Sequence, residues 1–212
     1  MEYITLPGTE LKVSRICLGT MQFSNSWEWP CTQAQATAVV DAAMASGVNF
    51  FDTAQAYQVD GDRCSEKMLG IALGERRSEV VIASKFGLHA GEDQTVCDAA
   101  AVTQAIDDTL AALGTDYLDL MQIHWPGNIG YLGEQQADWL DAKEIVAALE
   151  AAVGAGKLKY YGLCNFGTGA KNASYLVRCH TKTGNFTKTG SGQTQEHHSK
   201  REAFFCRGPR CV

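Results

Sequence analysis

Short apolar runs alternate along this chain with segments whose apolar residues recur at the spacing of one helix face. The runs have no polar alternation, which is typical of strands covered on both faces; they span 16–19, 48–52, 80–84, 118–123 and 160–163. A strand followed by a helix about every forty residues predicts parallel strands joined by right-handed crossovers. The pattern therefore predicts an α/β fold.

Four helices are expected from apolar residues at i, i+3, i+4 and i+7. Thr32 and Ser65 are predicted to cap the first two helices, and glycines follow the last apolar position of each helix. The stripes are Ala36, Val39, Val40 and Ala43; Leu69, Ala72 and Leu73; Val102, Ala105, Ile106, Leu110 and Leu113; and Val146, Leu149 and Val153. A β-hairpin is predicted ahead of them, over 3–6 and 11–13 around Pro7-Gly8-Thr9.

The repeat stops near residue 170. Residues 1–170 are therefore predicted to form about five β/α units of a TIM (β/α)8-type barrel, which is usually roughly 250 residues long when complete. Residues 171–212 carry eight Lys or Arg against two Glu, although the whole chain has a net charge of −6. That segment is basic and low in apolar residues, a composition that predicts a disordered tail with no further strand.

Four polar residues follow the predicted strands at their carboxyl ends. Asp52 and Tyr57 lie in FFDTAQAY, Lys85 lies in VVIASKFG, and His124 lies in LDLMQIHWP. The carboxyl ends of barrel strands converge at one mouth, where barrel enzymes place their chemistry. An acid, a phenol, an amine and an imidazole at that mouth predict proton transfer to or from a carbonyl oxygen.

Composition excludes several partners. The acidic balance, with a pI near 5.3, argues against nucleic acid and against an acidic membrane surface. The eight cysteines are scattered without a C-x-x-C pair, and together with the absence of a signal peptide they favour a cytoplasmic protein with reduced thiols. His197, His198, Cys206 and Cys211 fit no standard zinc spacing, so no metal site is predicted.

Five motifs taken together resemble the aldo/keto reductase family. They are SRICLGTM, GVNFFDTAQAY, VVIASKFG, TDYLDLMQIHWP and GKLKYYGLCNFG, and they occur in this order on the predicted strands. The resemblance implies an eight-stranded barrel that reduces aldehydes and ketones with a nicotinamide cofactor, usually NADPH. It also implies that Tyr57 is the general acid, that Lys85 lowers the pKa of this phenol, that Asp52 holds Lys85 in an ion pair, and that His124 orients the carbonyl.

The same resemblance implies a nicotinamide contact. Its residues would be Gly19, Thr20 and Met21 on the first strand, with Asp52, Cys164 and Asn165; Cys164 stands where the family usually has serine. Trp27, Trp29 and Trp125 would line the substrate pocket or simply cover the core.

The family's phosphate-binding motifs are not found after residue 170. We therefore expect a carboxyl-terminally truncated reductase that binds NADPH poorly. Two alternatives stay open: a redox-inactive binding or regulatory relative, and a truncated product without function.

Overall fold

The structure of the protein is a computed structural model that describes residues 1–24, 31–57, 63–87, 99–124 and 142–164. Its strands are β1 (Tyr3–Thr5), β2 (Lys12–Ser14), β3 (Cys17–Gly19), β4 (Phe50–Asp52), β5 (Val81–Phe86), β6 (Leu118–Ile123) and β7 (Leu158–Leu163). Its helices are α1 (Gln33–Ala45), α2 (Cys64–Leu73), the short 3₁₀ helix η1 (Gly74–Glu79), α3 (Ala99–Leu113) and α4 (Ala142–Gly154).

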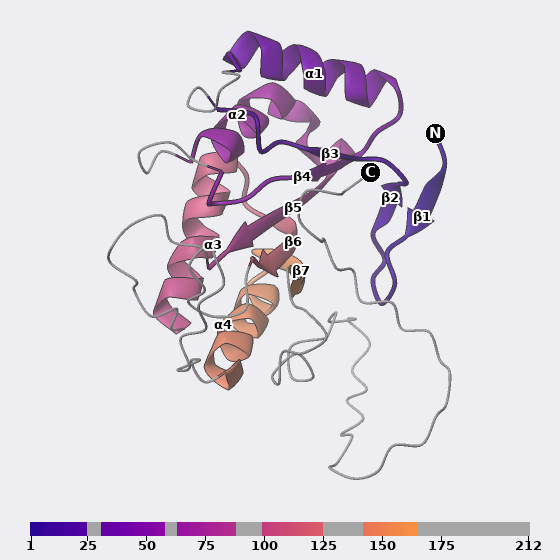
Figure 1. The fold of residues 1–212 in the computed structure, drawn as a ribbon. Helices are drawn as coiled ribbons and strands as arrows, with labels where there is room; N and C mark the ends of the chain where they lie inside the picture. The colour runs from indigo at the N-terminus through magenta and orange to yellow at the C-terminus, as the bar shows by residue number, and fades with distance from the viewer. Residues whose placement is uncertain (25–30, 58–62, 88–98, 125–141, 165–212) are drawn as a thin grey trace, which may run out of the picture.

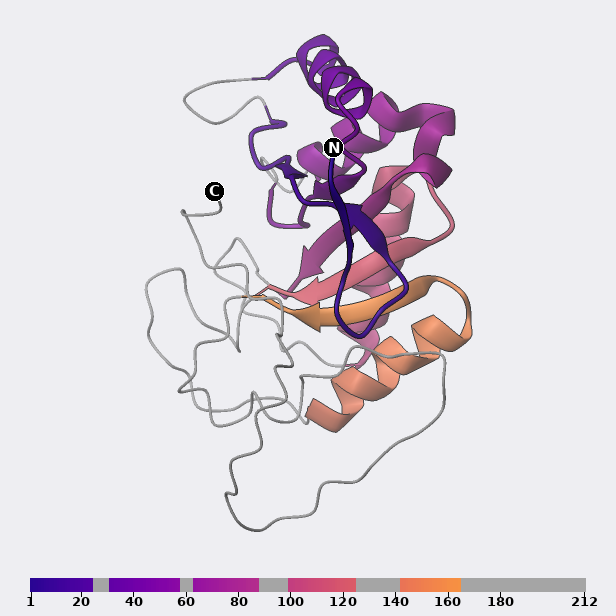
Figure 2. The ribbon, with the colours of Figure 1, turned by 90° about the vertical axis from the view of Figure 1, so that its right-hand side faces the viewer.

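The described strands confirm the parallel sheet. Five of them pair in the order β3-β4-β5-β6-β7, and every neighbouring pair is parallel. Because the strands run in chain order and point the same way, their carboxyl ends lie along one edge, as Figures 1 and 2 show. This is the arrangement of successive β/α units in a barrel.

The helices cover one face of the sheet (Figure 1). Between helices and strands lies the main apolar core, which includes Phe51, Ile82, Met121 and Tyr161 from the strands and Leu149 from α4. The packing of α2 against α3 depends on Gly70, because a Cβ there would lie 2.3 Å from the Leu113 carbonyl oxygen. A side chain at this position would force the two helices apart.

The hairpin β1-β2 lies against the other face of the sheet. Its apolar residues Leu6, Leu11 and Val13 pack on Val81, Ala83, Leu120 and Tyr160 in a second buried cluster. The backbone N–H of Glu10 donates to the Tyr160 hydroxyl at 3.1 Å. The cluster sits toward the amino ends of the strands, so the opposite end is left for the polar side chains that follow β4, β5 and β6.

Two details of the predicted helices differ from the structure. Thr32 forms the capping box predicted for the start of α1, but Ser65 does not cap α2: the helix begins after Arg63, and Ser65 is its second residue. The Ser65 hydroxyl instead bonds Thr20 and Thr53. Val39 was expected in the buried stripe of α1, yet it is 43% exposed, whereas Val40 is fully buried.

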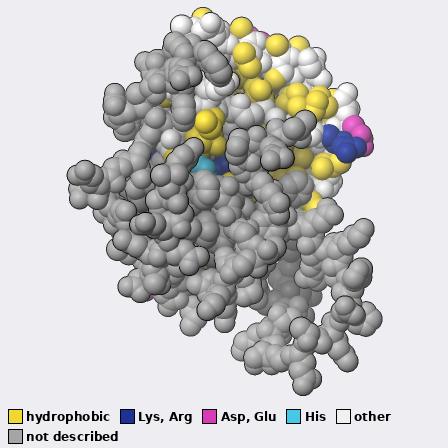
Figure 3. Space-filling view, viewed as in Figure 1, with side chains coloured by type: hydrophobic (Ala, Val, Ile, Leu, Met, Phe, Trp, Pro, Cys, Tyr) yellow, Lys and Arg dark blue, Asp and Glu magenta, His cyan; other side chains and the backbone are white. Residues whose placement is uncertain are grey.

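Several large hydrophobic side chains remain at the surface of the described residues. Figure 3 shows hydrophobic side chains gathered on one part of the face that is turned to the viewer. Among the described residues, the exposed large hydrophobic side chains include Val39, Ile16 and Ile71, and the last two are more than half exposed.

Residues 171–212, including the four His and Cys of the zinc alternative, lie outside the described residues. Among the helices that the structure describes, none is long and apolar enough to cross a membrane.

Candidate active site

The four predicted site residues come together at the carboxyl edge of the sheet. Asp52 is the last residue of β4, Lys85 is the last but one of β5, and His124 directly follows β6. Tyr57 lies in the segment after β4, where its backbone N–H donates to Ala54 O at 3.1 Å. Residues alternate across a strand, so Lys85 shares the face of Val81 and Ala83, which belong to the hairpin cluster.

Lys85 is the centre of the arrangement, and its side chain is only 2% exposed. Its Nζ donates to Asp52 Oδ2 at 2.5 Å, to the Thr53 carbonyl oxygen at 3.0 Å and to Tyr57 Oη at 3.3 Å. An ammonium has three hydrogens to donate, so all of them have acceptors. The ammonium is thereby fixed between a carboxylate and a phenol.

His124 lies beside the phenol. The imidazole and Tyr57 rings meet edge to face, with centroids 5.8 Å apart. The backbone N–H of His124 donates to Phe86 O at 2.8 Å, which ties the residue to the end of β5. Burial, with a smaller contribution from the Lys85 charge, lowers the pKa of His124 to about 3, so the imidazole is neutral near pH 7.

The pKa of Tyr57 is raised overall, although Lys85 acts on it in the predicted direction. Burial disfavours the phenolate and raises the pKa above its ordinary value; Lys85 lowers it, but not enough to reverse the effect. Burial also opposes the charged form of Lys85, yet the nearby Asp52 and Tyr57 raise the pKa of Lys85 above its usual range. The resting site thus holds a protonated phenol next to a charged ammonium.

The residues expected near the nicotinamide are placed only in part. A Cβ on Gly19, at the end of β3, would meet nothing within 4 Å, and Met21 is 42% exposed. Thr20 is fully buried, and its hydroxyl donates to the Asp52 carbonyl at 3.1 Å. Cys164 is buried after β7, and its backbone N–H donates to Ile123 O. Asn165 and the tryptophans Trp27, Trp29 and Trp125 lie outside the described residues.

Sequence reasoning missed the polar groups behind the site. Thr53 supplies a carbonyl to Lys85, and Ser65 joins Thr53 to Thr20. Glu66, also fully buried, accepts from Ser84 Oγ at 2.6 Å and pairs with Arg63 at 3.1 Å. The sequence did offer one signal: Ser65 and Glu66 stand together at the start of the predicted apolar face of α2. Polar side chains that are buried require hydrogen-bond partners, so this pair pointed to a buried polar network.

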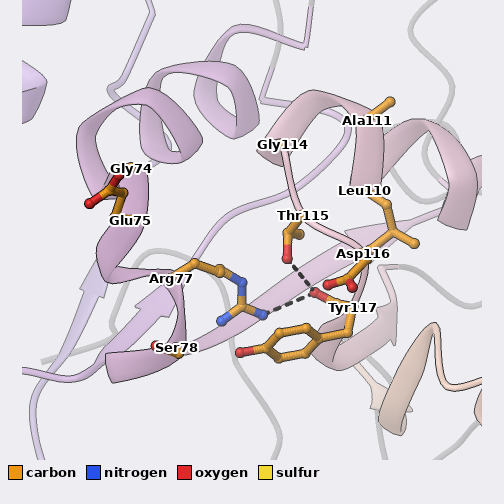
Figure 4. A pocket seen from close by; sticks show the side chains of 10 residues that line it. All are labelled: Gly74, Glu75, Arg77, Ser78, Leu110, Ala111, Gly114, Thr115, Asp116 and Tyr117. Carbon is orange, nitrogen blue, oxygen red and sulfur yellow. Dashed lines mark hydrogen bonds between the residues drawn. The ribbon is translucent and has the colours of Figure 1, made fainter.

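A shallow groove lies at the opposite end of the strands, away from these residues. It is formed by η1 and by the turn between α3 and β6 (Figure 4). Arg77 donates there to the Tyr117 carbonyl at 3.1 Å and to Asp119 at 2.8 Å.

No group of three or more His, Cys, Asp or Glu in the described parts of the chain is arranged to hold a metal ion.

Comparisons with known proteins establish the family of the chain. The model of the aldo/keto reductase family matches residues 15–189, and the chain belongs to that family. Protein tas of Escherichia coli is 33% identical over 184 residues, which cover 78% of this chain and 52% of tas. The family acts on small carbonyl compounds by oxidoreduction and generally uses NAD(P)H.

Solved structures give the same result. An aldo-keto reductase of Pseudomonas aeruginosa superposes with a TM-score of 0.63 at 30% identity, covering 77% of this chain and 60% of that one. The holo form of the reductase AKR11C1 from Bacillus halodurans also gives 0.63, at 26% identity, with 78% and 51% covered. The neighbours confirm the barrel architecture, and the chain spans about half the length of the curated relatives it matches.

Proposed function

We propose that the site of Asp52, Tyr57, Lys85 and His124 reduces aldehydes or ketones to alcohols with NADPH. The observation that carries the proposal is the position of the Lys85 ammonium, which donates both to the Asp52 carboxylate and to the Tyr57 phenol. An ammonium at a phenol oxygen stabilises the phenolate, which helps wherever the phenol must lose its proton and then regain it during the reaction.

Tyr57 would be the general acid. Its raised pKa keeps the phenol protonated before the reaction, so the proton is available to the carbonyl oxygen. When the proton leaves, the phenolate forms 3.3 Å from Lys85 Nζ, and the ammonium stabilises the new negative charge. Asp52 keeps Lys85 charged and in place, which the raised pKa of Lys85 reflects.

His124 would orient the substrate. Because its pKa is lowered to about 3, the imidazole is neutral and can offer one N–H to a carbonyl oxygen without competing as an acid. Its edge-to-face contact with Tyr57 places the two rings side by side. A carbonyl oxygen bound there would face a hydrogen-bond donor and a proton donor together.

The described residues fit one end of the cofactor. Gly19 leaves open space at the end of β3, and the exposed Met21 is two residues on. Asp52 ends β4 and Cys164 follows β7, both at the carboxyl edge of the sheet. With Thr20 and Asn165, these residues would hold the nicotinamide. A bound NADPH would supply the hydride, and this chain's side chains would hold and transfer the proton.

A turnover assay tests the proposal. Purified chain is incubated with NADPH or NADH and a panel of aldehydes and ketones, and the alcohol product is quantified. A parallel calorimetric titration of NADPH separates failure to bind from failure to react. Alcohol formation that requires Tyr57 supports the proposal. A chain that binds NADPH tightly and reduces no carbonyl in the panel contradicts it and favours a redox-inactive relative.

A further inference from the structure

Three hydroxyl groups meet behind the Asp52–Lys85 pair. Ser65 Oγ lies 2.7 Å from Thr20 Oγ1 and 3.0 Å from Thr53 Oγ1, and it donates to the Thr20 carbonyl at 2.7 Å. The three residues are fully buried. They come from the ends of β3 and β4 and from the first turn of α2, so one helix residue joins two neighbouring strands.

One arrangement of hydrogens satisfies this cluster. A hydroxyl has one hydrogen to donate; when Ser65 gives it to the Thr20 carbonyl, Ser65 Oγ accepts from Thr53 Oγ1. The Thr20 hydroxyl has two acceptors within reach, the Asp52 carbonyl and Ser65 Oγ. In this arrangement, removing Ser65 Oγ takes the acceptor from Thr53 and one donor from the Thr20 carbonyl.

Each partner of Ser65 is bonded in turn to a site residue. The Thr53 carbonyl accepts from Lys85 Nζ at 3.0 Å, and the Thr20 N–H donates to the Asp52 carbonyl at 2.9 Å. The backbone N–H of Ser65 itself donates to Tyr57 O at 3.2 Å. Three of the four site residues are thus one hydrogen bond away from Ser65 or from its hydroxyl partners.

We infer that Ser65 is a positioning residue, whose buried hydroxyl fixes the turns after β3 and β4 and so aims the Lys85 ammonium at Tyr57. Loss of this hydroxyl shifts the Thr53 carbonyl, and Lys85 then loses one of its three acceptors. The claim that Ser65 assists catalysis rests on the proposed function. The claim that Ser65 holds Lys85 in place can be tested whether or not the chain has activity.

Ser14 provides a matched control. It is 2% exposed, its Oγ donates to Ile16 O at 2.6 Å, and it accepts from the Asn49 N–H at 3.1 Å. Ser14 therefore resembles Ser65 in burial and in bonding to backbone. It lies beside the start of β4, away from the carboxyl edge, so Ser14→Ala disturbs the fold without touching the site.

The test measures how fast Lys85 reacts. The full 212-residue chain, Ser65→Ala, Ser65→Cys and Ser14→Ala are treated with formaldehyde and cyanoborohydride, and methylation of Lys85 is followed by peptide mass spectrometry. Lys157 and Lys159, both more than 40% exposed, are internal references in every sample. Thermal unfolding of each variant measures how much stability the substitution costs.

We expect Lys85 methylation to accelerate severalfold in Ser65→Ala, less in Ser65→Cys, and not in Ser14→Ala. Ser65→Cys keeps the shape of the side chain with a slightly larger, weakly hydrogen-bonding atom, and it provides the test if Ser65→Ala does not fold. An unchanged Lys85 rate in the folded Ser65 variants, or an equal acceleration in Ser14→Ala at the same loss of stability, overturns the inference.

Activity gives a second readout. Where the chain reduces a carbonyl, Ser65→Ala should lower kcat far more than it raises KM, because the substrate contacts are retained while the proton donor is misaligned. A chain that binds NADPH tightly but has no turnover, and whose Lys85 still reacts faster in Ser65→Ala, refutes the proposed function and supports the positioning role. Equal changes in kcat for Ser65→Ala and Ser14→Ala contradict that role.

Discussion

The two ends of the sheet carry the same kinds of residue in different arrangements. At the carboxyl end, Lys85 lies between Asp52 and Tyr57. At the amino end, Arg77 and Lys159 flank Tyr117 and share the buried Asp119, at 2.8 and 2.7 Å. Both ends thus combine cations, a carboxylate and a phenol, yet only the first has the geometry for proton transfer.

The difference lies in what each cation faces. Lys85 Nζ donates to the hydroxyl of Tyr57, where the charge can stabilise a phenolate. Arg77 and Lys159 instead lie over the ring of Tyr117, 4.2 and 4.4 Å from its centroid, and each is bonded to an oxygen of Asp119. A cation over an aromatic face contributes to packing, whereas a cation at the hydroxyl changes the proton equilibrium.

The largest expected effect separates the two tyrosines. Tyr57→Phe removes the proton donor and should lower kcat by at least ~10³-fold while NADPH affinity stays nearly unchanged. Tyr117→Phe keeps the ring between the two cations and should leave kcat within about twofold, as its hydroxyl has no role in the proposed proton transfer. Steady-state product formation by both variants decides the matter; substantial turnover in Tyr57→Phe reassigns the acid.

The two lysines should differ in stability. Lys85→Met leaves Asp52 half-buried without its ion-pair partner and should lower the free energy of unfolding by about 3 kcal/mol. Lys159 is 48% exposed, and Asp119 keeps Arg77, so Lys159→Met should cost less than about 1 kcal/mol. Urea unfolding at neutral pH measures both. Equal losses would show that the two ends are electrostatically alike.

A smaller effect depends on pH. The unfolded chain binds a proton at His124 below its ordinary pKa of about 6.5, whereas the folded chain does so only near pH 3. Stability contributed by the neutral imidazole is therefore present above pH ~6.5 and is lost as the pH falls toward 3, by about 1.4 kcal/mol per unit. His124→Asn should flatten the curve over this window. Parallel curves for the two proteins would mean that His124 titrates normally.

Much of this arrangement was predictable because it depends on strand order. Asp52, Lys85 and His124 follow apolar runs, and parallel strands bring their carboxyl ends together whatever the details of packing. The role of Ser65 was not predictable in the same way. A serine before an apolar helix face satisfies the capping rule, and only the close approach of α2 to β3 and β4 turns its hydroxyl inward.

The net pKa shift of Tyr57 could not be predicted from the sequence either. The motifs imply that Lys85 lowers the pKa of Tyr57, but the net direction depends on how deeply the phenol is buried, and burial prevails. Val39 is exposed for a related reason: a helical stripe indicates which positions face inward, while the neighbouring elements decide how wide the covered strip is. The assignments of Trp27, Trp29, Trp125 and Asn165 stay predictions.

Isotope transfer tests the central claim most directly. NADPH deuterated at the transferable position of its nicotinamide is incubated with the chain and an aldehyde, at a cofactor concentration high enough to offset the weak NADPH binding expected from the sequence. The alcohol is examined by mass spectrometry and NMR. The account predicts alcohol with one deuterium on the carbinol carbon from the wild-type and Tyr117→Phe proteins, and at least ~10³-fold less of this labelled alcohol in the same time from Tyr57→Phe. Unlabelled alcohol from the wild type, or an equal yield of labelled alcohol from Tyr57→Phe, would contradict it.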